Sequence, residues 1–191
     1  MRQSKKLQEQ LTKLLVGIFG EDCVYSERSM RHGKADALRD FAKYAPVPDI
    51  AVGPFNLTKE SRVEDSDRNK SASQHWLIDE IEQICKGQNG DISRNANPRC
   101  LLAIEIAFSG APKYILGEFA NASMMGLLGV VVGSSENFYK LQRVGEYAGF
   151  LRLVGKAYPT MFTNIACFKA EEFVALLEAT AAVSPAIIGP Q

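Results

Sequence analysis

The fold of this chain is decided by residues 100–133, which read CLLAIEIAFSGAPKYILGEFANASMMGLLGVVVG. The run Cys100–Phe108 is almost continuously apolar, a pattern typical of a strand that is buried on both faces. A turn at Ser109–Pro112 leads into a helix expected over 113–125, and Leu127–Gly133 is a second buried strand. This strand–helix–strand unit predicts an α/β domain.

The flanking sequence extends the same pattern. Apolar periodicity predicts helices over about 4–19, 74–86, 136–156 and 170–180, and strands over about 22–27, 49–55 and 163–168. The order of these elements predicts an α/β fold with a mixed central sheet flanked by helices. We expect residues 1–191 to form a single domain, with 56–98 as an insertion that carries one helix of its own. Within it, residues 59–70 hold eight charges in twelve positions, which is typical of an exposed loop.

The overall charge argues against a strongly basic surface. The chain has 22 Lys and Arg against 22 Asp and Glu, whereas proteins that coat duplex DNA carry an excess of basic residues. A local excess occurs at 28–43, with five basic and two acidic side chains; it could contact phosphate, but a solvated helix face is the better explanation. The chain has no apolar run of membrane-spanning length and no CxxC spacing. These features predict a cytoplasmic protein with no membrane partner.

Two carboxylates stand out as candidates for chemistry. Glu105 is a lone charge within the apolar strand, and Asp49 opens another strand directly after Pro48. Burying an unpaired charge costs several kcal/mol, on the order of 3–5, so such a side chain normally has a partner. If the strands are neighbours, the two carboxylates could converge on Mg2+ or Mn2+. Alternatively, Glu105 pairs with a buried Arg or Lys and Asp49 caps a turn, and the residues alone leave both interpretations open.

The order of the elements over residues 4–133, with Pro48–Asp49 and Glu105 in place, resembles the core of the PD-(D/E)XK nucleases, the restriction-endonuclease-like proteins. The resemblance implies a metal-dependent nuclease that hydrolyses phosphodiester bonds in DNA or RNA with Mg2+ or Mn2+. It also implies that Asp49 and Glu105 bind the metal, with the Ile106 carbonyl as a further ligand. Many relatives are dimers, so a homodimer is a further expectation.

One position departs from the family pattern. The pattern has Lys two residues after the acidic residue, and here that position is Ala107. Some members carry the lysine on the following helix, so the resemblance implies that Lys113 takes its place and activates the attacking water. Without that lysine, the alternative is a catalytically inactive restriction-endonuclease-like binding or interaction module.

Several other residues are weaker candidates. Glu118 and Asn121 follow Lys113 on the same expected helix, and we expect both at the surface rather than in the site. Glu9 and Glu27 could supply an extra carboxylate from the early elements. The aromatic residues of the helix over 136–156 are expected in the core or at an interface.

Overall fold

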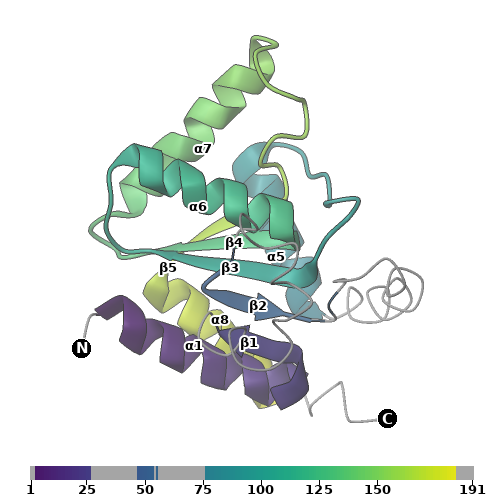
Figure 1. Ribbon diagram of the computed structural model, residues 1–191, viewed down its shortest axis with the longest axis vertical. Helices are drawn as coiled ribbons and strands as arrows, with labels where there is room; N and C mark the ends of the chain where they lie inside the picture. The colour runs from purple at the N-terminus through teal and green to yellow at the C-terminus, as the bar shows by residue number, and fades with distance from the viewer. Residues whose placement is uncertain (1–2, 27–46, 54, 56–75, 184–191) are drawn as a thin grey trace.

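The computed structural model describes residues 3–26, 47–53, 55 and 76–183 (Figure 1). Its centre is a five-stranded mixed sheet in the order β1-β2-β3-β4-β5. The first three strands are antiparallel neighbours, whereas β3, β4 and β5 run parallel to one another. The strands are β1 (Val24–Ser26), β2 (Ile50–Val52), β3 (Cys100–Ala107), β4 (Gly126–Gly133) and β5 (Ile165–Lys169).

Helices cover both faces of this sheet, so the predicted α/β class is confirmed. In Figure 1, α6 and α7 lie on one side of the sheet, and α1 and α8 lie on the other. A fifth helix, α5, packs against β5. The helices are α1 (Gln3–Phe19), α5 (Trp76–Asn89), α6 (Pro112–Met125), α7 (Phe138–Leu153) and α8 (Ala170–Val183). None of these described helices is long and apolar enough to cross a membrane.

The β3–α6–β4 unit matches the prediction to within one residue at each strand boundary. Pro112 occupies the first turn of α6, where its missing N–H would have no helical partner in any case. The helix then lies close to the sheet, because a Cβ on Gly129 would stand 2.9 Å from the carbonyl carbon of Ala122. The small residues of this face therefore set how near α6 comes to the strands.

The opposite face of the sheet holds the larger apolar cluster. Ile50, Leu102 and Ile104 are fully buried there, together with Leu11 and Leu15 of α1. The same cluster includes buried side chains of α5, which lies within the segment expected to be an insertion. That helix is thus part of the main core. The charged stretch 59–70 and the basic stretch 28–43 lie outside the described residues.

Candidate functional site

Glu105 is the unusual side chain of the core. It lies in the middle of the sheet on β3, and only 2% of its surface is exposed. It shares the α6 side of the sheet with Ala103 and Ala107, because alternate residues of a strand point to the same face. Among the described residues, Glu105 Oε1 is the one buried side-chain oxygen or nitrogen without a hydrogen-bond partner. Buried polar atoms are nearly always paired, so this oxygen calls for an explanation in terms of function.

Asp49 lies directly beside Glu105. Ile50 pairs with Ile104 across the antiparallel β2–β3 ladder, so the preceding residue, Asp49, comes opposite Glu105. Asp49 Oδ2 accepts a hydrogen bond of 2.7 Å from the Ile106 backbone N–H. The Asp49 backbone carbonyl accepts a second bond of 2.7 Å from Gln8 Nε2 on α1. Two elements therefore hold the half-buried aspartate at the place where β2 begins.

The prediction for Glu118 and Asn121 was wrong. Both side chains are half-buried rather than exposed, and both act on Glu105 from α6. The physical reason is helical periodicity, because Glu118 falls within the buried stripe formed by Ile115, Phe119 and Met125. The sequence contains this signal: counting helical positions from the apolar residues of α6, rather than from Lys113, would have placed Glu118 and Asn121 toward the sheet.

The electrostatics of the cluster disfavour a charge on Glu105. Burial raises the pKa of Glu105 to about 10, and a hydrogen bond with the carboxyl group of Glu118 acts in the same direction, followed by the charges of Glu118 and Asp49. Hydrogen bonding from the Asn121 amide acts in the opposite direction but is weaker. In the absence of a cation, burial and the two neighbouring carboxyl groups thus favour the protonated form of Glu105.

Lys113 lies at the start of α6, but its side chain is exposed. Its ammonium nitrogen is 5.0 Å from the centroid of the Tyr114 ring. Within the described part of the chain, Lys113 forms no ion pair with a carboxylate. Among the described residues, Glu105 likewise forms no ion pair with an Arg or Lys, so this alternative interpretation is not supported.

The donor atoms fit a hard divalent cation. No three His, Cys, Asp or Glu side chains in the described ranges are grouped so that they could share one metal ion. Mg2+, however, is usually held by one or two carboxylates, with water completing its coordination shell. Asp49 and Glu105 provide such a pair, and Glu105 Oε1 offers an acceptor that a cation would satisfy. The Ile106 carbonyl points to the Asp49 side of β3, because a strand residue directs its N–H and its C=O the same way.

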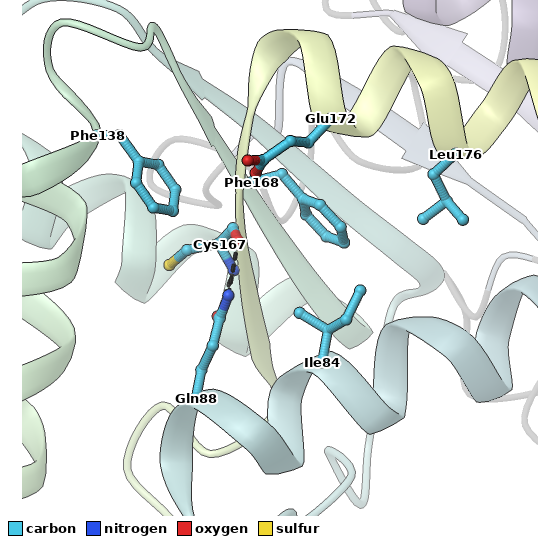
Figure 2. A pocket seen from close by; sticks show the side chains of 7 residues that line it. All are labelled: Ile84, Gln88, Phe138, Cys167, Phe168, Glu172 and Leu176. Carbon is cyan, nitrogen blue, oxygen red and sulfur yellow. Dashed lines mark hydrogen bonds between the residues drawn. The ribbon is translucent and has the colours of Figure 1, made fainter.

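A groove lies away from this cluster. It has a volume of about 420 Å³ and lies beside β5, lined mainly by apolar side chains of α5, α7, β5 and α8 (Figure 2). Within it the Gln88 amide pairs with the backbone of Cys167, donating to its carbonyl at 2.7 Å and accepting from its N–H at 2.8 Å. Gln88 thereby covers part of the edge strand, and none of the predicted site residues lines this groove.

The remaining candidates do not add to the site. Glu9 is exposed on α1, and Glu27 lies outside the described residues. Cys85, Cys100 and Cys167 have free thiols, and burial raises the pKa of each to about 12. A thiol with so high a pKa is a poor nucleophile at neutral pH.

No protein-family model, curated protein or solved structure matches this chain. The buried carboxyl cluster beneath α6 is therefore the feature on which a functional hypothesis has to rest.

Proposed function

We propose that the protein is a metal-dependent phosphodiesterase acting on nucleic acid, with a divergent restriction-endonuclease-like site at Asp49 and Glu105. The observation that carries the proposal is the buried Glu105, whose Oε1 lacks a hydrogen-bond partner among the described residues and which faces Asp49. Two further features support it. The elements follow one another as α1–β1–β2–α5–β3–α6–β4, which is the order behind the resemblance once α5 is set apart, and Asp49 comes opposite Glu105 on neighbouring strands.

Asp49, Glu105 and the Ile106 carbonyl are the groups that would hold Mg2+ or Mn2+. When bound, such an ion supplies a Lewis acid that activates water and neutralises charge on a phosphate. The chain's own contribution is positioning. The Ile106 N–H fixes one Asp49 oxygen, and the Gln8 amide fixes the backbone of the same residue. We place the protein in the cytoplasm, with DNA or RNA as its partner.

Cleavage of nucleic acid by the purified protein tests this proposal. Wild type is expected to cleave DNA or RNA in Mg2+ or Mn2+, and Asp49→Asn or Glu105→Gln should reduce cleavage by roughly 100-fold or more, the range seen when a group that stabilises the reacting charge is removed. Glu178→Gln is the matched control, because Glu178 is an exposed glutamate on α8, on the other side of the sheet. Equal activity of wild type and Asp49→Asn would refute the proposal.

A second candidate is a binding module that keeps the fold without catalysis. Two observations favour it: Lys113 is exposed beside Tyr114, and Ala107 occupies the position of the family lysine. Titration with Mn2+ in a calorimeter separates the candidates. Absence of any binding that depends on Asp49 and Glu105 would favour the module, whereas binding accompanied by cleavage would favour the nuclease.

A second copy of the chain is the proposed protein partner, through α7. The outer face of this helix exposes apolar side chains, including Tyr139 at 52%, Phe150 at 56% and Leu153 at 84%. Arg143 and Glu146 lie on the same face by helical spacing. In a two-fold interface, Arg143 of one copy would therefore face Glu146 of the other. Light scattering on a sizing column should give a dimer mass, and Phe150→Glu should give a monomer. A wild-type mass of 21.0 kDa at all concentrations would exclude this interface.

A further inference from the structure

One edge of the sheet brings the starts of two helices beside Asp49. The parallel strands β3, β4 and β5 end together at this edge, since Ala107 pairs with Gly133 and Gly133 pairs with Lys169. Asp49 lies at the same edge, because it directly precedes β2, which runs antiparallel to β3. The chain leaves the edge into α6 and α7, whose first turns lie at the left of Figure 1.

Lysine ammonium groups lie close to aromatic rings at the starts of both helices. Lys113 Nζ is 5.0 Å from the centroid of the Tyr114 ring on α6, and Lys140 Nζ is 5.9 Å from that of Tyr139 on α7. Tyr114 is 60% exposed, and neither lysine forms an ion pair with a carboxylate within the described ranges. Both charges are therefore available to an anionic partner, and the Tyr114 ring is available for stacking.

The acidic side chains of this edge lie mainly toward α8. Glu172 pairs with Lys169 at 2.8 Å, and Glu171 accepts a hydrogen bond from Ser135. Neither α6 nor α7 has an acidic residue in its first turn, although Glu136 precedes α7. Apart from the cation site itself, the part of the edge beyond β3 and β4 thus carries two lysines against one exposed glutamate.

A partner that fits this surface offers phosphate groups to the lysines and the flat face of a base to the Tyr114 ring. Single-stranded nucleic acid has both, and proteins bind it with basic side chains along its backbone and aromatic side chains on which its bases stack. A duplex fits less well, because its bases are already stacked on one another and have to be splayed out before a ring can reach them.

We propose that the edge formed by the starts of α6 and α7 binds single-stranded nucleic acid, with one base stacked on Tyr114 and phosphates held by Lys113 and Lys140. The proposal rests on the proposed function, in which nucleic acid is the partner, and adds the form of the substrate and the residues that bind it. It gives Lys113 a role in binding rather than in the activation of water. Tyr139 receives no base, because it belongs to the α7 face assigned to a second copy of the chain.

Fluorescence anisotropy with labelled oligothymidine and oligouridine, in EDTA, tests this surface without a contribution from a metal ion. Tyr114→Ala should weaken binding by roughly 5–150-fold, the range for loss of one stacked base, whereas Tyr114→Phe keeps the ring and should bind nearly as wild type does. Lys113→Ala and Lys140→Ala should each lower the slope of log Kd against log salt concentration by about 0.7. The matched controls are Tyr158→Ala and Lys156→Ala, two exposed side chains beyond the other end of α7, and both should bind as wild type does.

The outcomes separate this proposal from the nuclease proposal. Weaker binding by Tyr114→Ala, recovery in Tyr114→Phe and a smaller salt slope in the lysine variants support the surface, since a merely structural defect would not change the salt slope. Equal binding by wild type and Tyr114→Ala, absence of binding by wild type, or tighter binding of a duplex overturns it. Cleavage that depends on Asp49 would then leave the nuclease proposal standing. Conversely, binding through Tyr114 by a protein that does not cleave in Mg2+ or Mn2+ would overturn the nuclease proposal and support the surface.

Discussion

One face of the central sheet carries Ile50, Leu102 and Ile104 beneath α1 and α8, whereas the other carries Ala51, Ala103 and Glu105 beneath α6. These residues alternate along the same two strands, so the two faces are made by neighbouring positions. The first face is filled by large apolar side chains. The second uses small ones, which bring α6 close and leave a buried carboxyl group among polar neighbours.

The contrast indicates that the two faces of the sheet contribute differently to stability and to chemistry. A face filled with branched aliphatic residues gains free energy from burial and packing. A buried carboxyl group without a basic partner costs free energy instead, and such local conflicts concentrate at functional sites. We expect the first face to determine how stable the protein is, and the second to determine how that stability depends on pH and on cations.

The largest expected effect is a pH dependence caused by Glu105. Its pKa is raised from the ordinary glutamate value of 4.5 to about 10 in the native protein, so between these limits the native state holds one proton more than the unfolded state. The free energy of unfolding of the metal-free protein should therefore be highest below the lower limit. It should fall as the pH rises, by up to about 1.4 kcal/mol per pH unit.

Urea denaturation in EDTA at several pH values measures this slope. Glu105→Gln cannot ionise and should flatten it, and saturating Mn2+ should reduce it in the wild type. An identical slope in wild type and Glu105→Gln would show that Glu105 does not cause the pH dependence of the free energy of unfolding.

Ile104→Ala probes the apolar face at the residue next to Glu105. Ile104 is fully buried, and truncation of such a side chain typically lowers the free energy of unfolding by about 2–5 kcal/mol. The same urea titrations should show this loss at every pH. The stabilisation by Mn2+ should match that of wild type, because the lost methyl groups face away from the site. A changed response to Mn2+ would show that the two faces are coupled.

Gly129→Ala tests whether the close approach of α6 is required. The new Cβ would lie 2.9 Å from the Ala122 backbone, and overpacking of this kind costs about 1–3 kcal/mol. The control is Gly117→Ala on α6 itself, where a Cβ meets nothing within 4 Å. That substitution should stabilise the helix by about 0.5–1 kcal/mol. Thermal melts measure both effects. A lower melting temperature for Gly129→Ala and a higher one for Gly117→Ala would support the close packing of α6, and equal shifts would contradict it.

The sequence predicted the scaffold better than it predicted the site. Long apolar runs, with Pro112 at one junction and glycines at the other, are local signals, and they placed β3, α6 and β4 correctly. Glu105 and Asp49 could be selected because a charge within an apolar strand is conspicuous. Glu118 was expected at the surface, because the burial of its side chain depends on which side of α6 meets the sheet, and that depends on tertiary packing. The sequence left the aromatics of α7 open between the core and an interface for the same reason, since only the packing of α7 shows that Tyr139, Tyr147 and Phe150 are exposed.

The smallest expected effect lies at the edge of the sheet, where neither face is involved. The Gln88 amide substitutes for a neighbouring strand by pairing with both backbone groups of Cys167 (Figure 2). Asn89 Nδ2 similarly donates to the Ile165 carbonyl at 3.0 Å. Gln88→Ala should lower the free energy of unfolding by no more than about 1 kcal/mol, because water can replace an exposed hydrogen bond.

Hydrogen exchange is the sensitive measurement for this edge, because it reports the Cys167 amide itself. Exchange of that amide should become faster in Gln88→Ala and stay unchanged in Gln88→Glu, whose carboxylate still accepts from the N–H. Such local behaviour, at constant pH slope and constant Mn2+ affinity, would show that edge protection is independent of the chemistry beneath α6. If Gln88→Ala instead altered the pH slope, the groove beside β5 and the carboxyl cluster would have to be treated as one coupled region.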